Sequence, residues 1–186
     1  MRRIVFWMSI SLDGYMSRLD GDMSWQSVDE ELHWHFNDVL SQASGFLGGR
    51  RTHELMTGYW PTADQDPAAS EPEAEFAGIW RDMPKIVYSR TLTSDEWATS
   101  IVRDVVPEEV RALKEEGEGD LVLGGPDLAQ SFFAHDLVDE LRLYVHPALI
   151  GEGKPWVLGR VERAWELLEA QPFANGVVLL RYARIS

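Results

Sequence analysis

The feature that most constrains the fold of this chain is a glycine pair that occurs twice, each time directly after an apolar run. Gly48-Gly49 follows Phe46-Leu47, and Gly124-Gly125 follows Leu121-Val122-Leu123. Glycine tolerates the tight backbone of a turn, so each site predicts a buried strand that passes through a turn into a helix. Strands that alternate with helices favour a sheet of mostly parallel strands. The sequence therefore predicts an α/β fold.

Strand and helix patterns along the rest of the chain agree with this expectation. Helices are predicted over 28–41, 51–58 and 107–117 and from Pro126, and strands over 4–10, 43–47, 85–88, 101–102, 120–123 and 177–182. Residues 141–146 alternate between apolar and polar, which predicts a half-exposed strand. Strands that gather near the C-terminus indicate antiparallel additions to the sheet.

Two local patterns predict further details of the helical half. Ser27 and Glu30 have the spacing of a capping box, so the helix over 28–41 is expected to begin there. The segment over 59–74 contains three prolines and several acids, and it is expected to be one long loop. Loops of that length in compact domains are usually functional.

Composition limits the classes of function. The 186 residues suit one domain over 1–186, and the formal net charge of -14 argues against nucleic-acid and membrane partners. The absence of cysteine excludes disulfides and thiol chemistry and fits a cytoplasmic protein. The N-terminal apolar stretch is too short for a signal peptide. A metal site is not expected, because His33 and His35 are two residues apart and point to different faces of a helix.

The glycine turns also predict a ligand. Glycine lets a phosphate approach the backbone, and the N–H groups at a helix N-terminus then point at it. Two such turns indicate the two ends of one dinucleotide, although each alone is also compatible with a plain strand-to-helix connection. The chain lacks the G-x-G-x-x-G fingerprint, so a Rossmann fold is the less expected source of the site.

A series of short motifs occurs in an order typical of one superfamily. The motifs are Ser11-Leu12-Asp13-Gly14, Gly49-Arg50-Arg51-Thr52, Tyr88-Ser89-Arg90, Gly124-Gly125, Leu137-Val138-Asp139-Glu140-Leu141 and the run over 147–154. Together they cover nearly the whole chain, which resembles the dihydrofolate-reductase-like superfamily. It is most similar to the C-terminal reductase domain of the riboflavin-biosynthesis deaminase/reductase. The resemblance implies a three-layer α/β/α fold with a mixed, mostly parallel central sheet and antiparallel C-terminal strands.

The same resemblance implies NADPH bound along the C-terminal edge of the sheet. Ser89 and Arg90 fall where the superfamily contacts the adenosine 2′-phosphate, and an Arg side chain offers a planar fork of charged donors for such a group. The implied cofactor-binding residues are Gly14, Gly49, Arg50, Arg51, Thr52, Ser89, Arg90, Gly124, Gly125, Pro126, Asp127 and Leu128.

The substrate end is expected around the first strand, the segment before the first helix and the start of the long loop. The implied substrate-binding residues are Trp7, Tyr59 and Trp60, and the implied catalytic residues are Asp13 and Trp25. Asp13 is alternatively a turn-former.

Two further sets of polar residues each have two expected roles. His53 is expected at a helix surface or at the cofactor edge. The acids of 29–31 either complement the helix dipole or include a substrate carboxylate.

Two positions depart from the pattern of the riboflavin reductases. Trp7 stands where they usually carry a Lys, and Leu123 stands where they usually carry a Glu. The lysine and the glutamate of those enzymes are polar groups associated with the ribosyl-phosphate substrate. Their replacement by apolar residues in this chain predicts a less polar, flat substrate.

The expected function is NADPH-dependent transfer of hydride to a C=N or C=O group of a small aromatic or heterocyclic substrate. The alternative is a non-catalytic ligand-binding or sensor protein on the same fold. A homodimer is also expected, with the strand over 141–146 pairing across its interface.

Overall fold

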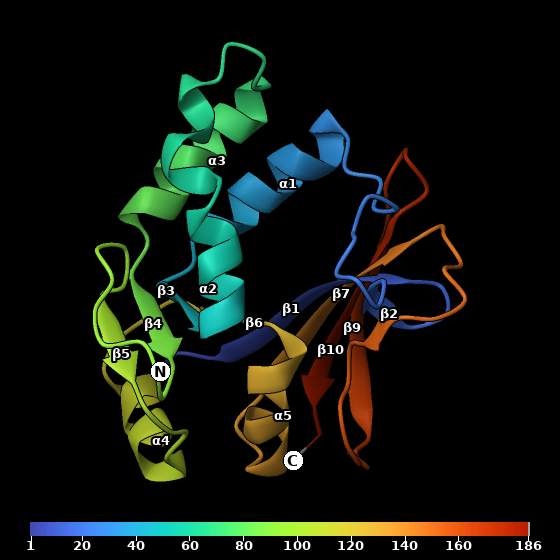
Figure 1. Cartoon of the computed structure of the whole chain (residues 1–186). Coiled ribbons are helices and arrows are strands. Elements are labelled where there is room, and N and C mark those ends of the chain that lie inside the picture. The colour runs from blue at the N-terminus through green and yellow to red at the C-terminus, as the bar shows by residue number, and fades with distance from the viewer. Residues whose placement is uncertain (186) are drawn as a thin grey trace.

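One eight-stranded sheet forms the centre of the computed structural model, which describes residues 1–185 (Figure 1). Its strand order is β5-β4-β3-β6-β1-β7-β10-β9. The strands from β5 to β7 are parallel, and β10 runs antiparallel to both β7 and β9. The predicted α/β fold with antiparallel C-terminal strands is confirmed. Ser186, the last residue of the expected domain over 1–186, lies outside the described residues.

The strands have the following bounds. They are β1 (Ile4–Ser11), β3 (Gly45–Gly49), β4 (Lys85–Tyr88), β5 (Ser100–Val102), β6 (Leu121–Gly124), β7 (Glu140–His146), β9 (Trp165–Pro172) and β10 (Val178–Arg184). A separate two-stranded sheet joins β2 (Tyr15–Ser17) to β8 (Lys154–Pro155).

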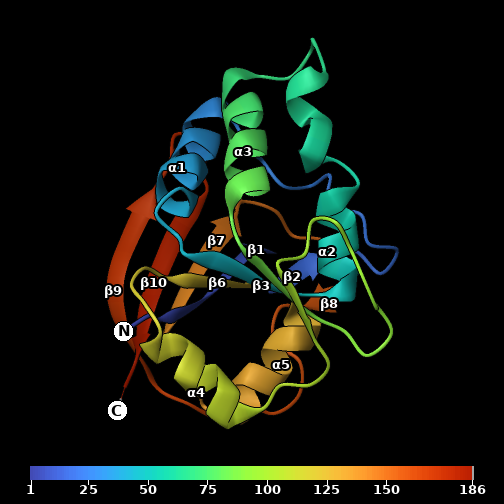
Figure 2. The same cartoon turned by 90° about the vertical axis from the view of Figure 1, so that its left-hand side faces the viewer.

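Helices cover both faces of the large sheet. Helices α1 (Glu30–Leu40) and α3 (Glu71–Asp82) lie over one face, and α4 (Pro107–Glu115) and α5 (Pro126–Ala134) lie over the other (Figures 1 and 2). Helix α2 (Arg50–Thr57) follows β3 directly. The predicted three layers are therefore present. No helix within residues 1–185 combines the length and apolarity needed to cross a bilayer.

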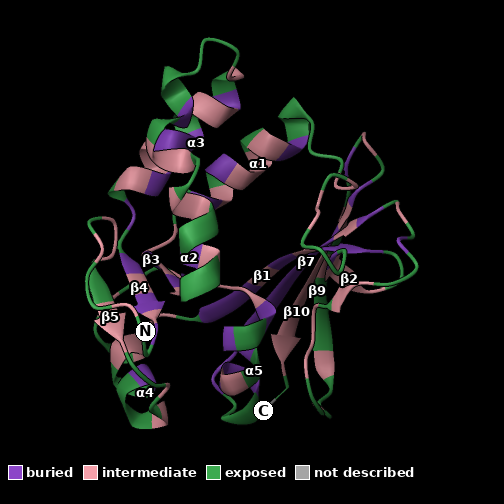
Figure 3. Cartoon of the chain, in the orientation of Figure 1, coloured by how far each residue is buried: buried purple, intermediate pink, exposed green. Residues whose placement is uncertain are grey.

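The core is divided by the sheet into two apolar layers. Along β6, Leu121 and Leu123 pack with α5, whereas Val122 points to the opposite face and packs near Phe76 and Trp80 of α3. Strand β1 is buried along most of its length (Figure 3). The ends of β1, β3 and β6 therefore lie between two helical layers, where ligands of open α/β sheets bind.

Strand β7 is buried on both faces, so the prediction of a half-exposed strand is wrong. Its polar side chains find partners inside the protein: Arg142 Nε donates to Glu140 Oε1 at 2.7 Å, and Arg181 Nε donates to the same oxygen at 3.0 Å. Both edges of β7 are already paired, to β1 and β10. The expected pairing of this strand across a dimer is therefore also wrong, while the homodimer itself stays a prediction.

The expected long loop over 59–74 is wrong. A 3-10 helix, η1 (Trp60–Gln65), occupies its first part, and α3 begins within its second part. The prolines do not prevent this, because the first turn of a helix has no use for their missing N–H. The Ser70 N–H donates to Glu73 Oε2 at 2.8 Å, which caps α3.

The capping box at Ser27 and Glu30 is wrong as well. Asp29 is the N-cap of α1, and its side chain accepts a hydrogen bond from the Leu32 N–H at 3.0 Å. The Ser27 N–H instead donates to His146 Nδ1 at 3.0 Å. The helix over 28–41 is confirmed apart from its first residues and its last one.

Candidate functional site

Two cavities meet at the C-terminal edge of the parallel strands. The first, here called the polar cavity, has a volume of about 800 Å³ and lies between the two glycine turns, the ends of β4 and β5, and α5. The second, the apolar cavity, has a volume of about 340 Å³ and lies under α1, α2 and α3. Thr52 and Gly125 line both cavities. These two residues mark the passage from one cavity to the other.

The polar cavity brings together most of the residues predicted to bind the cofactor. They are Gly49, Arg50, Arg51, Thr52, Ser89, Arg90, Gly125, Asp127 and Leu128. Of the remaining three, Gly124 lines the apolar cavity, Gly14 lies in the turn after β1 with φ of 85°, and Pro126 is buried at the start of α5. The parallel strands explain the gathering, because their C-terminal ends meet at one edge.

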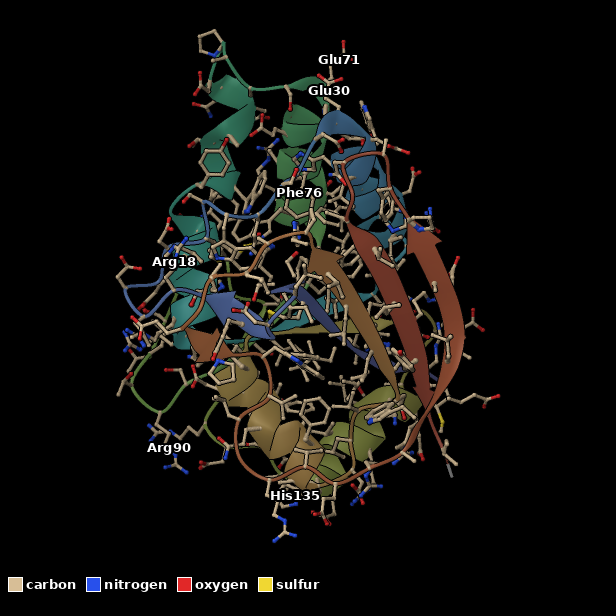
Figure 4. The ribbon with its side chains drawn as sticks, turned by 90° about the vertical axis from the view of Figure 1, so that its right-hand side faces the viewer. Arg18, Glu30, Glu71, Phe76, Arg90 and His135 are labelled. Carbon is tan, nitrogen blue, oxygen red and sulfur yellow. The ribbon has the colours of Figure 1, made fainter. Side chains whose placement is uncertain are left out.

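The arginines of the polar cavity differ in their partners. Arg90 Nε donates to Asp104 Oδ1 at 2.7 Å, and Arg50 forms an ion pair with Glu54 at 2.8 Å. Arg103 lines the same cavity and has no ion-pair partner within residues 1–185. Sequence reasoning missed Arg103, although its position directly after a predicted parallel strand was a usable signal. Figure 4 shows Arg90 and His135 at the periphery of the molecule.

Two other polar residues shape this cavity. The Ser89 hydroxyl accepts hydrogen bonds from the Thr91 and Leu92 N–H groups at 3.2 and 2.9 Å, so it forms the turn that carries Arg90. Asp127, an acid in the first turn of α5, forms an ion pair with Lys154. The Lys154 ammonium thereby neutralises the negative charge of the carboxylate beside the second glycine turn.

The two glycine turns differ in conformation. Gly125 has φ of 85°, and a Cβ there would lie 2.5 Å from Thr52 Oγ1. The backbone itself therefore requires glycine at this position, whatever binds beside it. Gly49 caps α2 with φ of -78°, and a Cβ there would lie 3.9 Å from Leu128 Cβ, an ordinary contact. Gly49 is consequently the position at which ligand binding can be separated from folding.

The apolar cavity is built of aromatic and methionine side chains. Trp7 and Trp60, two of the three residues expected to bind substrate, line it, and Phe36 and Phe76 line it from α1 and α3. The ring centroids of Trp60 and Phe76 lie 4.4 Å apart at 77°, an edge-to-face contact. Figure 4 shows Phe76 among the side chains inside the molecule.

Three ionisable side chains line the apolar cavity: His33, His53 and Lys85. Burial lowers the pKa of His33 and lowers the pKa of Lys85 to about 8. The Lys85 ammonium donates to the Met83 carbonyl at 2.7 Å and lies 4.2 Å from the centre of the Trp80 ring.

His53 is 5% exposed, so its expected place at a helix surface is wrong. Its Nε2 lies 2.8 Å from Asp95 Oδ1, which ties α2 to the segment between β4 and β5. The imidazole thus lines the apolar cavity one residue beyond Thr52.

Asp13 lies outside both cavities. Its carboxylate accepts hydrogen bonds from the Ser11 hydroxyl at 2.6 Å and from the Ile150 and Gly151 N–H groups at 3.1 and 2.8 Å. The bond from Ser11, followed by those from the backbone, lowers the pKa of Asp13. These contacts show the turn-forming role that was expected as its alternative, and a catalytic role stays a prediction.

Other predicted residues also lie away from the apolar cavity. Trp25 stands edge-on to His146 at 5.7 Å between ring centroids, and the Tyr59 hydroxyl donates to Glu73 at 3.2 Å. Leu123 is fully buried in the layer that faces α5, so its side chain does not face the apolar cavity. Trp7 alone therefore supports the expectation of a less polar substrate. Asp29, as the N-cap of α1, fits the structural reading of the acids of 29–31.

Comparisons with known proteins agree with this architecture. The family model for the RibD C-terminal domain matches residues 2–179. The uncharacterized protein YyaP of Bacillus subtilis is 32% identical over 183 residues, which cover 97% of this chain and 94% of YyaP.

Solved structures of lower identity share the fold. A pyrimidine reductase-like protein from Corynebacterium diphtheriae has a TM-score of 0.66 at 14% identity, with 100% of this chain and 92% of that one covered. The diaminohydroxyphosphoribosylaminopyrimidine deaminase/5-amino-6-(5-phosphoribosylamino)uracil reductase of Thermotoga maritima has a TM-score of 0.69 at 17% identity, covering 99% and 57%. Members of the matched family are usually reductases, which supports an oxidoreductase in general. The chain belongs to the RibD C-terminal domain family, with a dihydrofolate-reductase-like fold.

Proposed function

We propose that this chain is an NADPH-dependent reductase that transfers hydride to a C=N or C=O group of a small aromatic or heterocyclic substrate. The observation that carries the proposal is the meeting of a polar and an apolar cavity at Thr52 and Gly125. A dinucleotide in the polar cavity would present its nicotinamide at that passage, beside a substrate in the apolar cavity. Such placement aligns the nicotinamide carbon that gives the hydride with the substrate carbon that accepts it. This alignment is the main contribution of a protein to hydride transfer.

The residues of the polar cavity fit NADPH. Gly49 and Gly125 leave room for phosphate oxygens against the backbone at the starts of α2 and α5. Arg90 and Arg103 lie where strands β4 and β5 end, and they supply charged donors for a 2′-phosphate. When bound, the reduced nicotinamide supplies the hydride, and the chain binds, orients and shields the partners.

Turnover tests the proposal. Oxidation of NADPH is followed by absorbance with a panel of aromatic aldehydes, aromatic ketones and cyclic imines. Transfer of deuterium from nicotinamide-labelled NADPH into the reduced product identifies direct hydride transfer. Tight NADPH binding with no oxidation by any member of the panel would favour the non-catalytic alternative.

Gly49→Ala is expected to weaken NADPH binding at least about tenfold, or about 1.4 kcal/mol. The new methyl group enters the space of the phosphates, while the backbone of Gly49 accepts any residue. The melting temperature of the cofactor-free protein should be unchanged. Gly78→Ala in α3, where a Cβ has open space, is the matched control and should bind NADPH as the native chain does. Native affinity in Gly49→Ala would remove this turn from the cofactor site.

NADPH is expected to bind much better than NADH. A hydrogen bond to a charged group contributes roughly 1.5–3 kcal/mol, so Arg90→Ala and Arg103→Ala should each weaken NADPH by about 10- to 150-fold and barely change NADH. Calorimetric titration of both nucleotides measures this. Arg111→Ala, in the exposed part of α4, controls for a general loss of positive charge. Equal affinity of the native chain for the two nucleotides would contradict the assignment.

A further inference from the structure

The wall of the apolar cavity offers almost no partner for a charged group. Among the described residues, no Asp, Glu or Arg lines it, and Lys85 is the one lysine. The Lys85 ammonium is committed to the Met83 carbonyl at 2.7 Å and lies over the Trp80 ring. Burying an ion without a partner costs several kcal/mol. A phosphate or carboxylate inside this cavity would therefore be strongly disfavoured.

The same wall suits a flat aromatic guest. Trp60 packs edge-to-face on Phe76, and Trp7 packs on Phe36 with ring centroids 5.5 Å apart at 72°. Such clusters present both faces and edges of rings, which are the contacts that aromatic ligands use. Methionines such as Met56 complete the wall and adapt to irregular shapes.

The volume sets the size of the guest. About 340 Å³ is near the lower end of the range for small-molecule sites. We propose that the apolar cavity takes an uncharged, planar aromatic compound of about two fused rings, whose entering part carries neither phosphate nor carboxylate. This inference rests on the proposed function, because it names the substrate class of the same site.

A matched pair of probes tests the charge rule without requiring turnover. Acetylnaphthalene is an uncharged two-ring ketone, and the corresponding acetylnaphthoic acid differs from it by one carboxylate. Titration by calorimetry should show that the native chain binds the ketone at least about 100-fold more tightly than the acid. Equal binding of the two probes, or no saturable binding of the ketone, would overturn the proposal.

Leu55 provides a gain-of-binding test. It lines the apolar cavity from α2 but is 60% exposed, so a polar replacement leaves the core intact. Leu55→Lys should raise affinity for the acid at least about tenfold by supplying the missing charge. Leu55→Gln removes the same apolar contact without adding charge and should leave the acid weak. Equal gains in both variants would count against the proposal.

A second pair of variants tests the aromatic contacts. Trp60→Leu should weaken the ketone at least about tenfold, because an aromatic pair and its buried area are lost. Trp165→Leu is the control, because Trp165 is also half-buried but packs against the opposite layer of the core. Ketone binding with no NADPH oxidation would reject the reductase and leave the cavity assignment in place. NADPH oxidation confined to charged compounds would reject the assignment of the cavity to uncharged compounds and leave the reductase in place.

Discussion

The ribosyl-phosphate pyrimidine of riboflavin biosynthesis is expected to be a poor substrate of this chain, with kcat/KM at least about a thousandfold below that of a dedicated reductase. That substrate carries a phosphate and many hydroxyl groups. Trp7, whose ring packs on Tyr144 and Phe36, occupies the position at which the riboflavin reductases usually present a lysine. Polar groups left without partners in an apolar site lose transition-state binding by several orders of magnitude.

The assay compares both enzymes with this substrate and NADPH under one set of conditions. Trp7→Lys restores the missing cation and should raise kcat/KM for the phosphorylated substrate at least about tenfold. Trp7→Leu removes the same ring without adding charge and should give no such gain. Melting curves of both variants establish that they fold. Turnover by the native chain within about tenfold of the dedicated enzyme would show that Trp7 does not set specificity.

Stability is expected to fall by about 2 kcal/mol between about pH 7.5 and about pH 5 because of His146 alone. Its side chain is fully buried, and burial lowers its pKa to about 4. Nδ1 accepts the Ser27 N–H, so a proton on that nitrogen would replace an acceptor with a second donor. In the unfolded chain the imidazole takes up its proton near the ordinary pKa of about 6.5. As the pH falls, the unfolded state therefore takes up the proton before the folded state does. His146 makes its full contribution to the free energy of unfolding only above about pH 6.5.

Urea denaturation at several pH values measures this effect in His146→Gln against the native chain. The variant should lose the His146 part of the slope, so that the two curves converge toward pH 5, a value just above the pI of about 4.7. His135→Gln, at an exposed position after α5, is the matched control and should follow the native curve. Parallel curves for native chain and His146→Gln would contradict the burial argument.

The parallel half of the fold was predictable because its signals are local. Buried strands such as β6 are continuous apolar runs, and the glycine pairs mark where they end. Strand β7 was misread because alternating polar residues normally face water, whereas here Glu140 and Arg142 neutralise each other inside the protein. Strand β9 escaped prediction because its two adjacent leucines and three acids or amides give no period of two. Its place is fixed by pairing with β10, a contact that no local pattern records.

The candidate site divides in the same way. The glycine turns were recognisable from their places after buried strands, and Arg90 was assigned to the cofactor by the family resemblance. The structure brings them together because parallel strands end at one edge. The walls of the apolar cavity come from helices α1 and α3, whose approach depends on tertiary packing. Phe76 lies two residues beyond the loop expected over 59–74, in a stretch for which no element was predicted, and it carries no motif of its own. Trp25 and Tyr59 were assigned to the substrate end by resemblance to a family. Such a resemblance indicates where a segment lies in the fold but does not determine the direction in which its side chains point.

The contact between Thr52 and Gly125 has a consequence for how this protein can diversify. Since a Cβ at Gly125 would collide with the Thr52 hydroxyl and the backbone there is left-handed, no single substitution at Gly125 is neutral, and the two positions are epistatic. Leu55 and Met23, by contrast, line the neighbouring cavity from partly or largely exposed positions. Substitutions are therefore tolerated better in the walls of the apolar cavity than at the passage between the two cavities. Under the proposed function, substitutions in these walls would change the substrate range while the junction between the two cavities stays fixed.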